Sequence, residues 1–249
     1  MNIQAVLFDI DNTLNHVQEK EFLKAYLFEA GKAFSDLMSP DEFIERQMTV
    51  AAGYVHCDGS KPISECFKKE FSKGLSCSGD EVWNRMTGFI HSSFSKFQGL
   101  FLPYGGAAET IDELKKRKIK LIIASNPVWP EAVQVLRLEW AGLEPGSFEY
   151  ITGAENSHYV KPRTEYYLEI CRATGTDPSE CLMVGDDPVN DGISKAAGMT
   201  FYRVTHEKSD SEKEISGLLR DTYQQQISEP DKTGPLNELT DYIETIIKP

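Results

Sequence analysis

Short, almost continuously apolar segments constrain the fold of this chain more than any other feature of its sequence. Residues 181–185 read Cys-Leu-Met-Val-Gly, and four other segments have the same character. Strands with one face in water alternate apolar and polar residues, so unbroken apolar runs predict strands covered on both faces, as in a parallel sheet. The five predicted strands span residues 3–10, 119–124, 148–152, 181–185 and 200–204.

Helical patterns separate the later strands. They span residues 107–118, 131–141, 163–174 and 190–197, and Pro130 stands where the second of them begins. Proline is favoured at the start of a helix, because the N–H that it lacks would have no helical partner there. Strands that alternate with helices predict an α/β fold with a parallel sheet and right-handed connections.

Residues 15–98 break this alternation, because they contain no convincing strand but four helical stretches with apolar stripes. One stripe combines Phe43, Ile44, Gln47, Met48 and Ala51, and the others lie within residues 22–34, 63–71 and 82–90. Amphipathic stripes of this kind are typical of a helical bundle core. We therefore expect a helical module inserted after the first strand. The segment 98–106 would return the chain to the sheet as a hinge, with Gly105-Gly106 as a helix-entry turn.

The chain after residue 205 is expected to form a polar loop followed by a helix. An acidic run at residues 207–214 predicts a solvated surface loop. From Leu236 to Ile247, apolar residues recur at helical spacing. This stripe predicts a C-terminal helix that docks on the core.

The charge balance excludes several classes of partner. The 249 residues include 26 Lys and Arg against 39 Asp and Glu, which gives a net charge of −13. The long-range field of such a chain repels nucleic acid and anionic membranes, so a phosphorylated ligand needs a local cluster of cations. No apolar run approaches the length of a membrane span, and the N-terminus does not resemble a signal peptide. The sequence leaves the oligomeric state open.

The cysteines indicate a reducing compartment. Their odd number and the absence of a C-x-x-C pair favour free thiols in the cytoplasm over a disulfide framework or a zinc site. They are Cys57, Cys66, Cys77, Cys171 and Cys181.

Polar residues follow the predicted strands where each of them ends. Asp9 and Asp11 follow the first strand, Ser125-Asn126 the second, Lys161 the third and Gly185-Asp186 the fourth. Open α/β sheets bind ligands at the carboxyl ends of their strands, so these side chains should converge on one rim.

Carboxylates forced together at this rim need a cation. Asp9 and Asp11 are two residues apart at a strand end, so both side chains can face the same side. Gathered carboxylates repel and raise one another's pKa unless a positive charge neutralises them. Oxygen ligands of this kind suit Mg²⁺, and Lys161 would add a second positive charge for a phosphoryl group.

The pattern resembles the haloacid dehalogenase-like superfamily. The ordered motifs are D-x-D-N-T at residues 9–13, Ser125-Asn126, Lys161-Pro162 and G-D-D-x-x-x-D at residues 185–191. The resemblance covers residues 1–14 and 99–205, and implies a Rossmann-like catalytic core. It also implies that residues 15–98 form the superfamily's inserted all-α cap, with residues 206–249 as the polar loop and docking helix. Residues 124–130 and 155–158 are similar to an uncharacterised phosphatase-like branch.

The resemblance also implies roles for the motif residues. Asp9 would be the nucleophile that forms an aspartyl-phosphate, and Asp11 would protonate the leaving group and then activate water. The carboxylates of Asp9 and Asp186 and the backbone carbonyl of Asp11 would hold Mg²⁺. Phosphoryl oxygens would bind Ser125, Asn126 and Lys161, and Lys161 would also balance charge.

Four further residues would support the site. Thr13 would fix the first loop, Asp191 would orient water or Lys161, and Asp187 would lie beside them. Direct contact of Asp187 or Asp191 with the metal stays open. Asn12 stands where many relatives have glycine, at a position expected to need a positive φ, which asparagine tolerates. His16, His56 and Gln47 are candidates for substrate contact without a motif.

The second aspartate separates the activities of the superfamily. Family dehalogenases expel halide, which needs no protonation, whereas the alkoxide that leaves a phosphoester benefits from an acid. Asp11 therefore favours a Mg²⁺-dependent phosphatase acting on a small phosphorylated metabolite. A phosphoglucomutase-like phosphoryl transferase is an alternative, and a non-enzymatic phospho-ligand-binding protein on the same scaffold is another.

Overall fold

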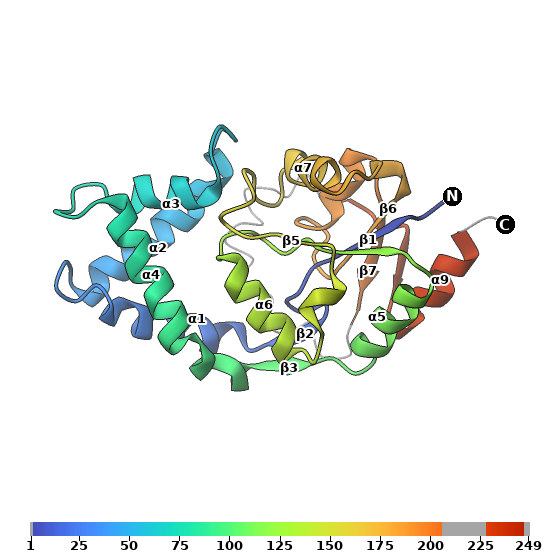
Figure 1. The fold of residues 1–249 in the computed structure, drawn as a ribbon, viewed down its shortest axis with the longest axis horizontal. Coiled ribbons are helices and arrows are strands. Elements are labelled where there is room, and N and C mark those ends of the chain that lie inside the picture. Colours follow the sequence, from blue (N-terminus) through green and yellow to red (C-terminus); the bar gives the residue numbers. More distant parts are fainter. Residues whose placement is uncertain (1, 206–227, 247–249) are drawn as a thin grey trace.

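A six-stranded sheet forms the centre of the computed structural model, which describes residues 2–205 and 228–246 (Figure 1). All neighbouring strands are parallel, in the order β5-β4-β1-β6-β7-β8. Their bounds are β1 Ala5–Phe8, β4 Lys120–Ile123, β5 Tyr150–Ile151, β6 Cys181–Gly185, β7 Thr200–Val204 and β8 Lys232–Gly234. The predicted α/β fold with a Rossmann-like parallel sheet is confirmed.

Helices cover both faces of this sheet, which explains its unbroken apolar strands. Along β1, Val6 and Phe8 belong to one buried cluster, while Ala5 and Leu7 belong to another. The first cluster includes α5 (Ala107–Lys116) and α9 (Leu239–Ile246), and the second includes α7 (Thr164–Thr174). Alternate residues of one strand therefore pack under different helices, whose positions around the sheet can be followed in Figure 1.

Four helices follow β1 along the chain within residues 15–98, as predicted. They are α1 Glu19–Lys32, α2 Pro40–Gly53, α3 Ile63–Phe71 and α4 Gly79–Ser93, and we call residues 15–98 the helical insert. Ser39 and Ser78 cap α2 and α4, because their hydroxyls accept the backbone N–H of Glu42 (3.3 Å) and Glu81 (3.1 Å).

The apolar stripe predicted for α2 does not coincide with the face of the helix that is buried. Ile44 is 37% and Met48 46% exposed, and Ala51 is also exposed, whereas Phe43 and Val50 are buried. The helix packs against α1 and α3 through a stripe narrower than its apolar residues suggest.

Three short elements differ from the predictions. β2 (Asn15–Val17) pairs antiparallel with β3 (Phe101–Pro103), although no strand was expected within residues 15–98, because three residues carry no readable alternation. Residues 192–197 of the predicted helix 190–197 form a 3₁₀ turn that Gly198 ends at φ +97°. β8 is a polar edge strand, so it has no apolar run to predict it.

The helix α6 (Glu131–Trp140) lies between the sheet and the helical insert. Its Leu138 belongs to the sheet cluster, while Val133 and Trp140 belong to the cluster of the insert. Just before α6, the Trp129 ring packs against Phe22 (centroids 5.9 Å apart) and Tyr26 (4.7 Å). The helical insert is therefore packed directly on the segment that follows β4.

The C-terminal stripe docks as predicted over the described residues. Leu236, Leu239 and Ile243 are buried beside α5. The acidic run at residues 207–214 and Ile247 lie outside the described residues. Short 3₁₀ turns complete the fold at Tyr54–His56, Phe94–Leu100, Pro145–Ser147, Pro178–Glu180, Gly192–Ala197 and Leu236–Glu238.

The described helices and the cysteines bear on two further expectations, concerning membrane spans and disulfides. None of the described helices is long and apolar enough to cross a bilayer. All five cysteines are free thiols.

Candidate active site

The ends of three adjacent strands bring the predicted residues together. β1 lies between β4 and β6, with Phe8 opposite both Ile123 and Val184. The ladder continues one step further, since the Asp9 N–H donates to the Val184 carbonyl (3.0 Å) and the Ala124 N–H to the Phe8 carbonyl (2.7 Å). The loops that begin with Asp9, Ser125 and Asp186 therefore start side by side.

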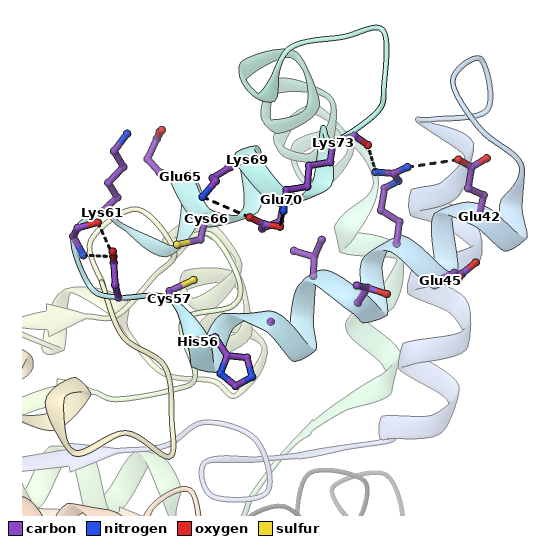
Figure 2. Close-up of a pocket in the computed structure, with 16 residues that line it drawn as sticks. Glu42, Glu45, His56, Cys57, Lys61, Glu65, Cys66, Lys69, Glu70 and Lys73 are labelled. Carbon is purple, nitrogen blue, oxygen red and sulfur yellow. Dashed lines mark hydrogen bonds and ion pairs between the residues drawn. The ribbon is translucent and has the colours of Figure 1, made fainter.

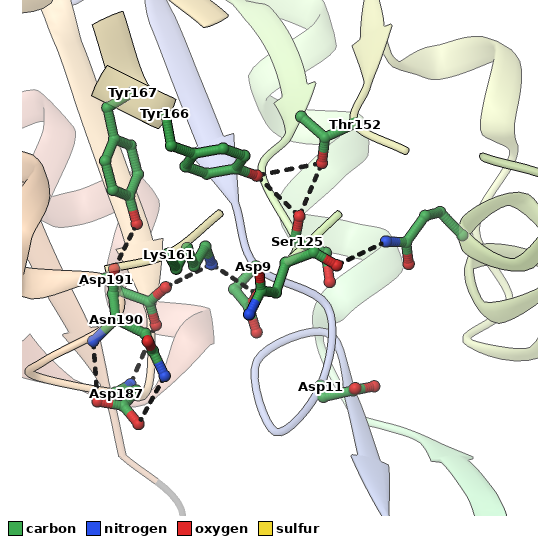
Figure 3. A network of polar contacts seen from close by, with 12 residues as sticks. Asp9, Asp11, Ser125, Thr152, Lys161, Tyr166, Tyr167, Asp187, Asn190 and Asp191 are labelled. Atoms are coloured by element: carbon green, nitrogen blue, oxygen red, sulfur yellow. Dashed lines mark hydrogen bonds and ion pairs between the residues drawn. The ribbon is translucent and has the colours of Figure 1, made fainter. Parts of the chain in front are cut away.

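Three carboxylates gather at this point beside one lysine, and Figure 3 shows Lys161 with two of them, Asp9 and Asp191. Asp9, Asp186 and Asp191 each offer an oxygen, and these oxygens lie within 4.8 Å of one another. Lys161 Nζ donates to Asp9 Oδ1 (2.8 Å) and to Asp191 Oδ1 (2.6 Å), and its side chain is 2% exposed. Within the described ranges this is the only cluster of Asp, Glu, His or Cys with metal-ligand spacing.

The charges of this cluster fit a divalent cation. Burial raises the pKa of Asp9 more than Lys161 lowers it, and burial raises the pKa of Asp191 to about 7. Burial also lowers the pKa of Lys161, but Asp191 and Asp9 outweigh this effect and hold it well above the usual value. The cluster thus holds three carboxylates and one lysine, which pairs with two of them, and all-oxygen ligands of this kind are the type that Mg²⁺ prefers.

The loop after β6 holds Asp191 in place. Its Oδ2 accepts the Asp187 N–H (3.0 Å), and the Asp187 carboxylate accepts the N–H groups of Val189 (2.7 Å) and Asn190 (3.1 Å). A Cβ on Gly185 would lie 2.1 Å from Asp191 Oδ2, so only glycine allows this approach. Asp187 bonds to its own loop, and Asp191 bonds to Lys161.

The loop after β4 is fixed by its backbone. The Ser125 carbonyl accepts hydrogen bonds from Tyr166 Oη (2.7 Å) and Thr152 Oγ1 (2.8 Å). The side-chain oxygen of Asn126 is buried without a hydrogen-bond partner among the described residues. Ser125 and Asn126 thus stand at the rim next to Asp9.

Asp11 lies apart from the lysine. Figure 3 shows its carboxylate turned away from Asp9 and Lys161. Its Oδ2 is paired with an Arg137 terminal nitrogen, and Arg137 is only 3% exposed. Sequence reasoning missed Arg137 and its neighbour Gln134. Two polar residues at i and i+3 among the apolar residues of α6 were the signal that could have identified them.

The turn between Asp11 and β2 has the conformation predicted for it. Asn12 has φ +54°, and its side chain bonds the Glu19 carboxylate (2.7 Å). The Thr13 N–H donates to the Ile10 carbonyl (3.2 Å), while its hydroxyl is buried and has no partner in the described part of the chain. The Thr13 backbone therefore contributes to the turn, and its hydroxyl does not.

The remaining candidates do not join the cluster. His16 Nδ1 lies 3.5 Å from the Tyr104 hydroxyl. His56 lines a pocket of the helical insert, between α2 and α3, and none of the motif residues lines that pocket (Figure 2). The Gln47 side-chain oxygen is buried without a partner among the described residues.

Comparisons with known proteins agree with this geometry. A family model described as haloacid dehalogenase-like hydrolase matches residues 3–198. Pyrophosphatase PpaX of Halalkalibacterium halodurans is 25% identical over 190 residues, covering 75% of this chain and 76% of the relative. PpaX of Bacillus velezensis is 27% identical and covers 79% and 80%. A phosphoglycolate phosphatase of Caulobacter vibrioides is 28% identical over 105 residues, covering 42% and 43%.

Solved structures share the fold over almost the whole chain. The structure of a HAD phosphatase from Thermococcus onnurineus superposes with a TM-score of 0.58 at 22% identity, covering 97% of this chain and 98% of that one. The L-2-haloacid dehalogenase of Xanthobacter autotrophicus superposes at 0.59 with 18% identity, covering 98% and 100%. With its family match, its sheet and its ordered motifs, this chain belongs to the haloacid dehalogenase-like hydrolases.

Proposed function

We propose that this hydrolase is a Mg²⁺-dependent phosphatase that removes the phosphoryl group of a small phosphorylated metabolite through an aspartyl-phosphate on Asp9. The observation that carries the proposal is the position of Asp9. It shares Lys161 with Asp191 and is clustered with Asp186, and a second aspartate follows two residues later. A phosphoric monoester hydrolase needs this combination of an oxygen nucleophile, a cation site and a separate acid.

Asp9 supplies the nucleophile of the first step. A carboxylate oxygen of Asp9 attacks phosphorus, the bond from phosphorus to the leaving oxygen breaks, and a covalent aspartyl-phosphate forms. Lys161 lies 2.8 Å from the Asp9 carboxylate and favours its ionised form, which is the form that attacks, against the opposing effect of burial. Bound among Asp9, Asp186 and the Asp11 carbonyl, Mg²⁺ would supply positive charge for the phosphoryl oxygens.

Asp11 moves the protons of both steps. As a carboxylic acid it gives its proton to the departing alkoxide. As a carboxylate it then takes a proton from the water that attacks phosphorus and releases Asp9 and inorganic phosphate. In-line displacement puts the leaving oxygen opposite Asp9 across phosphorus, so the acid must stand away from Asp9, as Asp11 does in Figure 3.

Ser125, Asn126 and Lys161 would bind the phosphoryl group. The first two begin the loop next to Asp9, and the carbonyl of Ser125 is held by two hydrogen bonds. Their hydroxyl and backbone N–H are the donors that the motif assigns to phosphoryl oxygens. Preorganised donors of this kind stabilise the charge that builds up on a transferring phosphoryl group.

The helical insert would act as the cap over this site, with the core in residues 1–14 and 99–205. Its backbone bonds the segment that leads to Lys161, through Ile63 N–H to Ser157 (2.9 Å) and Ser64 N–H to Ala154 (2.8 Å). Arg163 reaches back to the Cys57 carbonyl (2.6 Å). A cap docked in this position limits the size of the substrate and keeps water from the aspartyl-phosphate.

The relatives indicate which substrates to try first. Two that match along most of the chain are named pyrophosphatases, another is named a bifunctional riboflavin kinase/FMN phosphatase, and one that matches over a shorter range is named a phosphoglycolate phosphatase. We place the activity in the cytoplasm, because all five cysteines are free and the Cys171 and Cys181 sulfurs lie 3.9 Å apart without a bond.

A release assay tests the proposal. The purified protein is incubated with p-nitrophenyl phosphate, pyrophosphate and a panel of phosphorylated metabolites, with Mg²⁺ or with EDTA, and inorganic phosphate is measured. We expect phosphate release that requires Mg²⁺ and is absent from Asp9→Asn. Tight binding of a phosphorylated metabolite without release would favour the binding-protein alternative. Transfer to a second acceptor in place of release would favour the transferase.

A further inference from the structure

Arg137 is a buried cation that the four sequence motifs do not account for. It lies on α6, is 3% exposed, and pairs with Asp11 Oδ2. A buried charge costs free energy unless it is paired and hydrogen-bonded, so an arginine in this position needs a partner of opposite charge. Asp11 is that partner.

A second contact fixes the direction of the guanidinium. Arg137 Nη1 donates to Gln134 Oε1 (2.5 Å), and Gln134 Nε2 donates to the Asn126 carbonyl (3.3 Å). Gln134 is fully buried, and it lies three residues before Arg137, on the same face of α6. A chain of hydrogen bonds thus leads from the phosphate-binding loop at Asn126 to Asp11.

The helix that carries this chain is itself held on two sides. Leu138 packs into the sheet cluster, and Val133 and Trp140 pack into the cluster of the helical insert. Side chains on an element fixed in this way can hold a second group in a defined place.

The two carboxylate oxygens of Asp11 have different surroundings. Oδ2 is held by Arg137, while Oδ1 is buried without a hydrogen-bond partner among the described residues. Arg137 also gives Asp11 its own cation, so Asp11 does not compete with Asp9 and Asp191 for Lys161. One oxygen is anchored, and the other is left for a proton.

We infer that Arg137 is a positioning residue, which with Gln134 holds Asp11 by one oxygen so that the other exchanges protons with the leaving group and with water. This inference rests on the proposed function. Arg137 touches no reacting atom and acts through Asp11, so its loss should matter most where proton transfer matters most.

The test compares leaving groups in Arg137→Gln. An alkyl phosphate needs a proton on its leaving oxygen, whereas p-nitrophenyl phosphate hardly does. We expect kcat/KM, which reports formation of the aspartyl-phosphate, to fall about tenfold or more for the alkyl phosphate and much less for p-nitrophenyl phosphate. Hydrolysis of the aspartyl-phosphate is common to both substrates and should slow equally for both. Arg137→Lys keeps the positive charge but cannot contact Asp11 and Gln134 together as the guanidinium does. Its activity on the alkyl phosphate should therefore lie between those of Arg137→Gln and the wild-type chain. Arg117→Gln, which removes an arginine paired with Glu113 and Glu244, is the matched control and should change neither substrate.

A double-mutant cycle separates positioning from a merely structural role. In the Asp11→Asn background, Arg137→Gln should cause no further loss on the alkyl phosphate, because the two residues act as one unit. Equal losses of kcat/KM on both substrates, or additive losses in the cycle, would overturn the inference. So would a rise in KM confined to substrates with a second anionic group, since Arg137 would then bind substrate.

Two controls keep the outcome interpretable. If Arg137→Gln does not fold, Gln134→Met takes its place and should show the same selective loss at smaller size; unselective loss there would overturn the inference. Failure of the proposed function is a different result, because the wild-type chain would then release no phosphate, or Asp9→Asn would still release it.

Discussion

Asp9 and Asp11 are two residues apart on one loop, yet their surroundings differ in kind. Asp9 meets Lys161, Asp186 and Asp191, all of which follow strands of the sheet. Asp11 meets Arg137, which projects from a helix and is tied by Gln134 to the loop after β4. The same loop thus reaches two separate cations.

The difference shows how one loop can serve two kinds of chemistry. Around Asp9, carboxylates outnumber cations, which suits a metal and a nucleophile. Around Asp11, one arginine is paired with one carboxylate, which keeps Asp11 apart from the metal cluster. Each prediction below perturbs one of these two regions and leaves the other in place.

The largest effect is expected from Asp9→Asn. The amide is a poor nucleophile, so release of phosphate from every substrate should fall by about 10⁴-fold or more. Circular dichroism and thermal unfolding should show a folded protein. A folded Asp9→Asn protein with undiminished turnover would remove Asp9 from the first step.

Asp11→Asn should have a smaller and selective effect. Loss of the acid should slow an alkyl phosphate by about 10²- to 10⁴-fold, and the first turnover of p-nitrophenyl phosphate much less. Calorimetric titration should show that Mg²⁺ still binds, since only the backbone carbonyl of Asp11 is proposed as a ligand. Normal turnover of the alkyl phosphate would return dehalogenase-like chemistry to consideration.

The affinity for Mg²⁺ should rise with pH. Burial raises the pKa of Asp191 to about 7, and Asp191 lies within 4.8 Å of the proposed ligands Asp9 and Asp186. At pH 5 it carries a proton that the charge of a nearby Mg²⁺ would disfavour. The dissociation constant for Mg²⁺ should therefore fall by up to about tenfold per pH unit between pH 5 and 7, and level off above. Calorimetric titrations across this range check it. Asp191→Asn should flatten this dependence of the dissociation constant on pH. A dissociation constant that does not change with pH in the wild-type chain would contradict a magnesium site beside Asp191.

The smallest effect concerns the turn between the two regions. Asn12 has φ +54°, so Asn12→Ala should destabilise the fold by about 1–2 kcal/mol. Asn12→Gly removes the same contacts to Glu19 and Val17 but tolerates this φ, so it should cost less. Urea unfolding of the two variants measures the difference, and equal losses would assign the role of Asn12 to its side-chain hydrogen bonds alone.

The two regions also differ in how far the sequence predicted them. Asp9, Ser125 and Asp186 were predictable, because adjacent parallel strands end at one edge of the sheet and their apolar runs were readable. Arg137 and Gln134 were missed, because helical spacing shows that they share a face but not that the face meets the loop of Asp11. That contact depends on how α6 packs between the sheet and the helical insert.

Tertiary packing that the sequence does not reveal also explains where the predicted fold was wrong. β5 was predicted from a run that contains the apolar residues Phe148, Tyr150 and Ile151, whereas β8 is polar at the sheet edge and joins it only through pairing with β7. The stripe on α2 was misplaced, because the exposed Met48 and the buried Val50 are both apolar and only the position of the neighbouring helices decides between them.

The most direct test of the account is a rapid-quench experiment on Asp11→Asn with p-nitrophenyl phosphate. Formation of the intermediate needs little acid with this leaving group, but its hydrolysis needs the base, so the intermediate should accumulate. We predict a burst of about one p-nitrophenolate per chain, with mass spectrometry of the acid-quenched protein locating one phosphoryl group on Asp9. Continued turnover with no phosphoryl group on Asp9, or with the group on another residue, would contradict the account.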